Sequence, residues 1–584
     1  MTRGPNAPAS RPARILFLML LALACGGSRI ERAAAQGDTV PATVPPAAPT
    51  DTASISTSTA ADSIPLPHFE PIPDRWRDIK PPPFELYVEG HWYDPYNQNV
   101  LKGDYPIIGQ NTFLSLTASS DNVFEFSTAP TPSGVSAERP RSEPFFGDDN
   151  RSLLNGNLRL TLELYHGQTA FRPRDWEIRV TPVLSLNRLA LQENNNVNIN
   201  VRKGTDRNDS HLGFQELFFE KHLIDVSDRY DFVSLRVGIQ KFSSDFRGFV
   251  FTDFNRGARL FGTAGSNRWQ WNLAYFDLLE KDTNSELNTV FDDRHQHVFV
   301  ANVYRQDFLA LGYTAQLSFH YNRDEASEHV DENGVPVRPA IFGDAKPHEI
   351  RAYYLGWTGD GHIGRLNVSH AFYQVFGTDE RHPSTSREID IDARLAALEL
   401  SVDKDWMRFR ASALYASGDS DPRDDTGGGF DGIVDQPSFA GGPFSFWNQQ
   451  VIRLQGVNLV NKLSPLPNLR PNKFEGQANF VNPGIFIANV GYDAEVTPKV
   501  KAVANVNYLS FLDTAILTDF LNQPEIDNPI GIDSSLGVIY RPFLNNNAVV
   551  TVAGSMLNPL AGFDDIYESP GTLFSLLASV ALTY

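Results

Sequence analysis

From Thr112 to Tyr584 the chain alternates apolar and polar residues with a period of two, the pattern of β-strands whose two faces meet different surroundings. The segment 313–322 shows it most clearly. Its polar face carries Thr314, Gln316, Ser318, His320 and Asn322, and its apolar face carries Tyr313, Ala315, Leu317, Phe319 and Tyr321. The two tyrosines are eight residues apart, about 26 Å along a strand. At a tilt near 40° they span roughly 20 Å of height, close to the spacing of the two aromatic girdles of a membrane barrel.

Other segments share this two-faced pattern, and they include 158–165, 176–185, 233–240, 268–275, 407–415 and 500–508. The last nine residues show it to the final position. Leu576, Ala578, Val580, Leu582 and Tyr584 form one apolar face, which suits a lipid-facing strand that closes a barrel. This terminus also resembles the C-terminal signal that bacterial outer-membrane barrels present to the barrel-assembly machinery.

About 18 such segments occur, and the connections between them alternate in length. Short connections such as 264–267, 403–405 and 497–498 follow the even-numbered segments. Longer ones follow the odd-numbered segments, at about 128–155, 192–210, 243–256, 281–295, 324–347, 377–388, 418–482, 512–531 and 558–571. Outer-membrane barrels have short periplasmic turns and long outer loops. The sequence therefore predicts an all-β fold: a transmembrane antiparallel β-barrel of about 18 strands over residues 111–584, with both ends in the periplasm.

The chain before the barrel divides into three predicted parts. Residues 1–35 have the basic start, apolar run and small residues of a signal peptide, with cleavage before Cys25 or before Gln36, or lipidation of Cys25. Residues 36–83 form a linker rich in Pro, Thr and Ser, and we expect this leader to be disordered. Residues 84–110 are expected to form a short pre-barrel or plug segment, or an extra strand.

Composition narrows the possible partners. The net charge of −20 argues against nucleic acid, because phosphate binding needs a clustered basic surface. No apolar stretch of 18 or more residues follows the N-terminus. Cys25 is the only cysteine, so cleavage after it excludes cysteine-based metal sites and thiol catalysis. We predict no metal, cofactor or catalytic residue. The expected partners are outer-membrane lipid, the assembly machinery and small or anionic solutes.

The polar faces of the strands would line the lumen, and they contain more basic than acidic residues. The acids are Glu163, Glu177, Glu216, Glu220, Glu349, Asp493, Glu495 and Asp533. The basic residues predicted to line the pore are Arg159, Arg179, Arg236, Arg259, Arg268, Arg351, Arg365, Arg408, Arg410, Arg541 and Lys501. Because a guanidinium matches carboxylate and phosphate groups, this set could conduct an anion. Alternatively, Arg–Glu pairs simply stabilise the wall.

The longest loop begins Tyr415-Ala416-Ser417-Gly418-Asp419-Ser420-Asp421-Pro422 and continues Gly427-Gly428-Gly429-Phe430-Asp431. This stretch resembles the alginate-export family of outer-membrane porins. The resemblance implies an 18-stranded barrel whose Arg-rich lumen passes an acidic polysaccharide, although the Pro-rich leader and the lumen acids depart from it. The spacing of Asp419 and Asp421 does not fit an EF-hand, so a solvated acidic loop is favoured over a calcium site. The apolar run 439–447 is expected to fold into the lumen as a constriction or to pack on the rim.

Three classes of function remain. The leading hypothesis is a passive outer-membrane porin for small or acidic solutes, such as carbohydrates. The alternative is a scaffold or sheath around a secreted or electron-carrying partner protein. An outer-membrane hydrolase is disfavoured, because the 13 histidines show no Ser, His and acid arrangement. The sequence does not specify the solute or the oligomeric state.

Overall fold

The structure is a computed structural model that describes residues 100–128, 150–167, 173–191, 197–198, 200–340, 343–449, 453–454, 457–458, 469–521, 524–567 and 571–584. The predicted signal peptide, the predicted linker and residues 84–99 lie outside the described residues. The boundaries proposed for these segments therefore stay predictions.

Strands make up most of the described chain. The long ones are β1 (Thr112–Thr128), β2 (Asn150–His166), β3 (Trp176–Leu191), β4 (Asp206–Asp225), β5 (Phe232–Ser243), β6 (Thr252–Ala264), β7 (Trp269–Lys281), β8 (Asn288–Arg305), β9 (Tyr313–Asp324), β12 (Ile350–Ile363), β13 (Leu366–His382), β14 (Arg387–Lys404), β15 (Met407–Ala416), β19 (Ile485–Thr497), β20 (Val500–Ser510), β21 (Pro529–Tyr540), β22 (Ala548–Pro559) and β23 (Leu573–Thr583).

Short elements occur between the long strands. They are η1 (Val201–Lys203), β10 (His329–Val330), β11 (Pro336–Arg338), β16 (Thr426–Gly427), η2 (Gly442–Phe444), α5 (Phe446–Gln449), β17 (Arg453–Leu454), β18 (Val457–Asn458), α6 (Ala515–Leu521) and α7 (Ala561–Ile566). Among the described residues, no helix has the length and apolar composition needed to cross a membrane.

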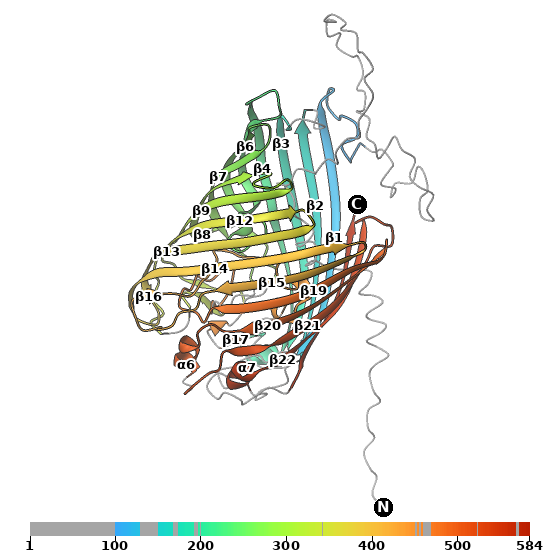
Figure 1. Ribbon diagram of the computed structural model, residues 1–584. Helices are drawn as coiled ribbons and strands as arrows, with labels where there is room; N and C mark the ends of the chain where they lie inside the picture. The colour runs from blue at the N-terminus through green and yellow to red at the C-terminus, as the bar shows by residue number, and fades with distance from the viewer. Residues whose placement is uncertain are drawn as a thin grey trace, which may run out of the picture.

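The long strands form one closed barrel (Figure 1). Within the described residues the main sheet has 19 strands, of which β16 contributes only two residues, beside β14. The other 18 pair antiparallel with their neighbours, and β23 closes the barrel on β1 from Ser119↔Thr583 to Ser127↔Ser575. Closure leaves no open sheet edge in the wall, as a membrane-spanning sheet requires. The predicted fold class and strand number are confirmed.

The two ends of the barrel differ in their connections, as predicted. We call them the short-turn end and the long-loop end. Two residues join β12 to β13 and two join β14 to β15, whereas 68 residues, 417–484, join β15 to β19. The connection expected at 377–388 is only 383–386, because β13 and β14 pair down to His382↔Arg387. Polar residues continue this ladder, since strand pairing satisfies their backbone groups as well as it does those of apolar residues.

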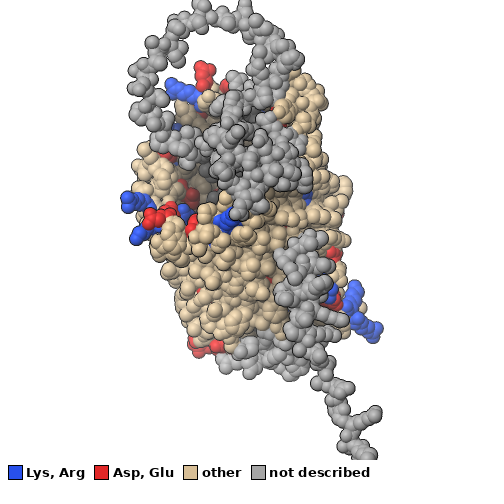
Figure 2. Space-filling model, turned by 90° about the vertical axis from the view of Figure 1, so that its right-hand side faces the viewer, with Lys and Arg blue, Asp and Glu red and all other residues tan. Residues whose placement is uncertain are grey.

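The outward face of the wall is apolar. Leu158, Leu317, Trp357 and Val490 are all at least half exposed, and each lies between inward residues of the same strand that are more buried. On the side that Figure 2 shows, a broad area of the wall carries few charged side chains. Apolar side chains in this arrangement are stable only against lipid, so the barrel is built to span a membrane.

The described part of the predicted pre-barrel segment lies against β1. The backbone N–H of Leu116 donates to the Leu101 carbonyl at 2.7 Å, and Lys102 forms a bridge with Ser115. These contacts begin just beyond Tyr584, whose own N–H donates to Ala118 at 2.8 Å. Residues 101–102 therefore continue the pairing of β1 past the point where β23 ends.

The main hydrophobic core lies inside the barrel. It joins inward residues of β7, β8 and β12–β15, including Phe276, Val298, Tyr354 and Leu395, to loop residues 249–251 and to the connection 417–484. We call residues 417–484 the lumen loop. The lumen loop, the β5–β6 connection and the connections β20–β21 and β22–β23, which contribute residues such as Ile516 and Phe563, thus give this barrel an apolar interior at its long-loop end.

Candidate functional site: the barrel lumen

Seven of the eleven predicted pore-lining residues face inward. Along their strands they occupy the same face as buried polar residues such as Asn157 on β2, Thr181 on β3, Ser412 on β15 and Asn505 on β20. The seven are Arg159 on β2, Arg179 on β3, Arg236 on β5, Arg259 on β6, Arg408 and Arg410 on β15, and Lys501 on β20.

The other four predictions of pore-lining residues are wrong. Arg268, Arg365 and Arg541 lie in the turns β6–β7, β12–β13 and β21–β22, because the strands end before them. Arg351 lies on β12 but on its exposed outward face, beside Glu349 and Glu380. The inward face of β12 here consists of Ile350, Ala352 and Tyr354, which pack against the lumen loop; the polar face therefore turns outward.

Most of the seven inward arginine and lysine side chains contact carboxylates. Arg179 bridges Glu163 at 3.2 Å, Glu177 at 2.9 Å and Glu216 at 3.3 Å across three strands. Arg410 and Lys501 share Asp493 at 2.7 and 3.3 Å. Such pairs hold neighbouring strands together, as the wall-stabilising interpretation expects, and Arg410 Nε has no hydrogen-bond partner in the structure.

Arginine and phenylalanine alternate on the inward face of β3–β6. The guanidinium carbon of Arg236 lies 4.3 Å from the ring centroid of Phe218, and that of Arg259 lies 4.4 Å from the ring of Phe261. Arg236 and Arg259 stand directly opposite each other, and Glu220 pairs with Arg236 at 2.6 Å. We call this set the arginine–phenylalanine row: Arg179, Phe218, Arg236, Phe261, Arg259 and Phe242. It holds positive charge beside flat apolar surfaces.

The apolar run 439–447 folds into the lumen, one of the two expected alternatives. Phe439, Phe446 and Trp447 are buried in the main core, and Phe444 packs with Val123, Val503, Ala553 and Leu577 of the wall. On the other side of the lumen, Phe249 packs edge-on against Phe439 at 5.5 Å between ring centroids. The lumen loop therefore reaches from the β5–β6 connection to β1 and β20–β23.

Buried carboxylates fix the lumen loop and the β5–β6 connection to the wall. Asp533 of β21 accepts from the N–H of Phe446 at 3.1 Å, from the N–H of Trp447 at 3.3 Å, and from Ser445 Oγ. Asp245, in the β5–β6 connection, accepts from Tyr373 Oη at 3.0 Å, and burial raises the pKa of this carboxyl group. Gly248 has φ +78°, and an added Cβ would lie 2.6 Å from the Gln436 carbonyl oxygen, so this contact between the two loops needs glycine.

An ion-pair cluster holds the lumen loop together internally. Arg470 Nε donates to Asp431 Oδ2 at 2.6 Å, and Lys473 Nζ lies 3.4 Å from Asp431 Oδ1 and also contacts Asp435. All four side chains are almost completely buried. Burial lowers the pKa of Lys473, and the neighbouring Asp431 carboxylate opposes this shift.

The start of the lumen loop is more buried than predicted. Asp419 is only 2% exposed, so the expectation of a fully solvated acidic loop is wrong at this residue. Its oxygens accept from the backbone N–H groups of Asp421 at 3.0 Å and Gly428 at 2.9 Å, which makes the group a turn rather than a set of converging ligands. Burial raises the pKa of Asp419 to about 6.

Two further groups of polar side chains, a cluster of carboxylates and a histidine beside a serine, resemble a metal site and a catalytic site. In the described chain, Asp209, Asp282 and Glu332 bring carboxylate oxygens within 4.8 Å of one another at the long-loop end. His382 Nδ1 lies 2.7 Å from Ser384 Oγ, and its Nε2 lies 3.0 Å from Asn479 Oδ1. The Ser384 hydroxyl donates to the Pro422 carbonyl at 3.0 Å, so this second group joins the β13–β14 turn to the lumen loop.

The predicted assembly signal has the expected geometry. Leu576, Ala578, Val580 and Leu582 lie on the outward face of β23, alternating with the inward Ser575, Leu577 and Ser579. Tyr584 follows them, with its ring 5.2 Å from Lys102 Nζ. Recognition of this strand by the assembly machinery stays a prediction.

Sequence patterns did not identify the residues that hold the lumen loop and the β5–β6 connection in place. Asp245, Asp431 and Arg470 lie in connections, where no periodicity marks an inward side chain. The available signal was the apolar composition of 439–447 together with inward positions such as Leu414 and Ala416, which are too apolar for a water-filled lumen.

No family model matches the sequence, and no curated protein matches it. The resemblance to the alginate-export family therefore stays a hypothesis. Solved structures do resemble the barrel. OccK9 (OpdG) of Pseudomonas aeruginosa is 10% identical with a TM-score of 0.44, and the match covers 80% of this chain and 98% of that one.

Two others resemble it to a similar degree. A BenF-like porin from Pseudomonas fluorescens Pf-5 is 11% identical with a TM-score of 0.44, covering 81% of this chain and 99% of that one. OccK2 (OpdF) of Pseudomonas aeruginosa, in complex with glucuronate, is 11% identical with a TM-score of 0.42, covering 80% and 97%. The fold assignment rests on the strand pairing described above.

Proposed function

We propose that this chain is a passive channel for small solutes in a bacterial outer membrane. The observation that carries the proposal is a closed barrel with an apolar outward face, whose lumen is lined by paired charges and narrowed by the lumen loop. In such barrels the short turns face the periplasm and the long loops face outward. A sheath around a partner protein would need the interior that the lumen loop already occupies.

The test is single-channel conductance in a planar bilayer. The wild-type protein should give small, steady openings. A variant in which a short Gly–Ser linker replaces residues 422–478 should conduct several-fold more current, because the constriction is gone while β15 and β19 still pair directly from Ala416↔Ile485. Heat-modifiable migration would show that this variant has folded. Two folded proteins that both fail to conduct would contradict the proposal.

We further propose that acidic solutes, including acidic carbohydrates, are preferred. The arginine–phenylalanine row supports this, because it places Arg236 opposite Arg259 and sets both beside aromatic rings. A carboxylate could bind the guanidinium donors while a sugar or other flat ring lies on phenylalanine. An alginate-type polysaccharide is one member of this solute class.

Selectivity is measured as the reversal potential in a salt gradient. The wild type should prefer anions, and the preference should weaken as the Debye length falls from about 10 Å at 0.1 M salt to about 3 Å at 1 M. Arg236→Gln with Arg259→Gln should reduce it. The matched control is Arg268→Gln with Arg365→Gln, two arginines in turns outside the lumen. A cation-selective wild type would contradict acidic-solute preference and leave the channel proposal intact.

A further inference from the structure

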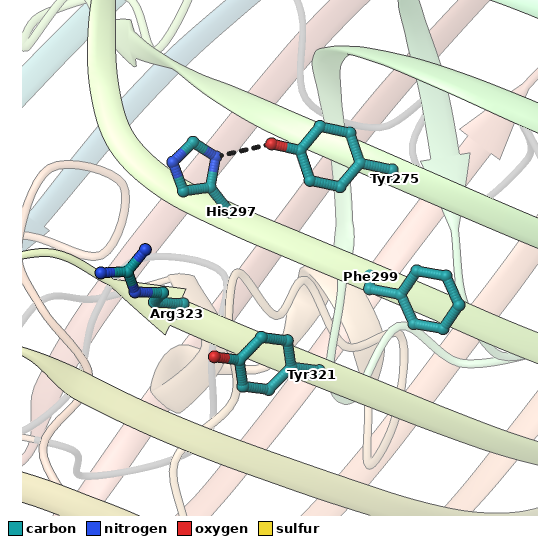
Figure 3. A pocket seen from close by; sticks show the side chains of 5 residues that line it. All are labelled: Tyr275, His297, Phe299, Tyr321 and Arg323. Atoms are coloured by element: carbon teal, nitrogen blue, oxygen red, sulfur yellow. Dashed lines mark hydrogen bonds between the residues drawn. The ribbon is translucent and has the colours of Figure 1, made fainter.

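A pocket of about 390 Å³ opens on the outward face of the wall, away from the lumen. Its lining comes from three neighbouring strands: Tyr275 of β7, His297 and Phe299 of β8, and Tyr321 and Arg323 of β9 (Figure 3). These side chains alternate with buried inward residues such as Phe276, Val298 and Asn322. Because this face of the barrel meets the membrane, the molecule that can enter the pocket is a lipid.

The pocket joins two rows that run around the barrel. The first row is aromatic: Tyr275, Phe299, Tyr321, Tyr353 and Phe376 are paired strand by strand in register. Tyr321 and Tyr353 stack at 4.9 Å between ring centroids, and Tyr353 and Phe376 at 5.3 Å. Aromatic rows of this kind lie at the level of the lipid headgroups. Lipid chains would therefore extend from here over the apolar band that includes Leu273 and Leu317.

The second row consists of charged residues. On each strand it lies two residues nearer the long-loop end than the aromatic row. Asp277, His297, Arg323 and Arg351 stand opposite one another on successive strands. Arg323 Nη1 contacts Glu325 at 2.9 Å and its Nη2 contacts Glu349 at 2.8 Å, yet two-fifths of this side chain is exposed. The row and its contacts contain three arginines and five carboxylates: Arg256, Arg323 and Arg351 with Asp277, Asp293, Glu325, Glu349 and Glu380.

This charge pattern selects among lipids. A purely anionic headgroup would meet Arg323 but also an excess of carboxylates. A headgroup with a phosphate beside an ammonium meets complementary groups on both sides. The phosphate would bind the exposed donors of Arg323, and the ammonium would lie near Asp277 or Glu325 and the rings of Tyr275 and Tyr321.

We propose that this pocket binds the headgroup of a zwitterionic phospholipid of the phosphoethanolamine class. Two contacts of His297 position the side chains that line the pocket. Tyr275 Oη lies 2.9 Å from His297 Nδ1, with the two rings stacked, and His297 Nε2 faces Glu325 at 3.8 Å. The imidazole thus lies between the carboxylates of Asp277 and Glu325, and Arg323 lines the pocket beside it. The site does not depend on the passage of a solute, so it stands apart from the proposed channel function.

The experiment is native mass spectrometry of the full-length protein in detergent, titrated with phosphatidylethanolamine or with phosphatidylglycerol of the same acyl chains. Wild-type protein should bind phosphatidylethanolamine at least about tenfold more tightly, since one charge-assisted contact corresponds to roughly that factor. Arg323→Gln should weaken the binding of both lipids, because Arg323 contacts the phosphate that they share. The matched control Arg394→Gln changes another outward arginine, paired with Asp392 away from the pocket, and should leave the binding of both lipids unchanged.

A second variant separates the two halves of the headgroup. Tyr321→Leu keeps the apolar bulk but removes an aromatic face, so it should weaken phosphatidylethanolamine binding and leave phosphatidylglycerol binding unchanged. Equal binding of the two lipids by the wild type would overturn the proposal. So would a preference for phosphatidylglycerol or lipopolysaccharide that requires Mg²⁺, because it would identify an anionic lipid bridged by cations.

Discussion

The two halves of strand β15 face different interiors although they belong to one strand. Toward the long-loop end, Leu414 and Ala416 are completely buried in the core that the lumen loop forms. Toward the short-turn end, the same face carries Ser412, Arg410 and Arg408, and Arg408 is about half exposed. Inward does not mean polar in this barrel; the side chain that suits an inward position depends on what fills the lumen at that height.

The difference also decides how much each half contributes to stability. In the lumen-loop cluster of Asp431, Arg470 and Lys473, the charges are fully buried, so the loss of one partner leaves the other without solvent or counter-charge. At the short-turn end of β15, the Arg408–Asp403 pair is about half exposed to water and contributes little. The following predictions test this contrast, from the largest expected effect to the smallest.

The substitution Asp431→Asn should have the largest effect. It removes the counter-charge of Arg470 and weakens that of Lys473, both almost completely buried, and such a loss costs about 3–5 kcal/mol. The lumen loop should detach and the channel conductance should rise, with faster proteolysis of residues 417–484. The control Asp392→Asn, in an exposed outward pair with Arg394, should change neither measurement.

Next, Asp533→Asn should loosen only the part of the loop near η2 and α5. One carboxylate oxygen that accepts from Ser445, Phe446 or Trp447 becomes an amide donor, which costs about 1–3 kcal/mol. Amide hydrogen exchange should accelerate at 445–447 and stay slow in the Asp431 cluster. Ser535→Ala, two residues along the same inward face, is the control, since its hydroxyl oxygen has no hydrogen-bond partner in the structure. Uniform acceleration in both regions would contradict local anchoring.

A pH-dependent opening of the loop start should follow from Asp419, because burial raises the pKa of this carboxyl group to about 6 from the ordinary value of 3.8. Between these values the folded loop binds more protons than an opened one, so its stability decreases as pH rises through this window. Protease cleavage near Gly418–Gly428 should therefore be slower at pH 4 than at pH 7. Asp419→Asn should remove the pH dependence, and a persistent pH effect would assign it to another group.

The smallest effect is expected from Arg408→Ser in the short-turn half. Arg408 pairs with Asp403 at the strand end, where both side chains are about half exposed, so its loss should cost less than about 1 kcal/mol. The melting temperature of the barrel should stay within a few degrees, and the reversal potential should move slightly toward cations as Asp403 becomes unpaired. Unfolding of this variant would show that the two halves do not differ as proposed.

Sequence periodicity identified the wall well. The alternation in 313–322 and in the last nine residues corresponds to β9 and β23, with the predicted residues on the outward face. This works because a strand places successive side chains on opposite faces whatever surrounds it, so an apolar outward face is visible in the sequence. Long ladders of polar residues hid the true ends of β8 and β13, since hydropathy reports the membrane band and not the extent of strand pairing.

The sequence by itself determined that 18 two-faced strands alternate with short turns and long loops, because that information is local and periodic. Only the tertiary structure decided which inward positions meet water. Tyr354 can be buried on the inward face because its hydroxyl donates to the Asp431 carbonyl, 77 residues away, at 3.0 Å. Arg351, three positions earlier on β12, therefore lies on the outward face. Such contacts depend on where a long loop folds back. The period-two pattern of the strands contains no information about contacts between residues so far apart in sequence.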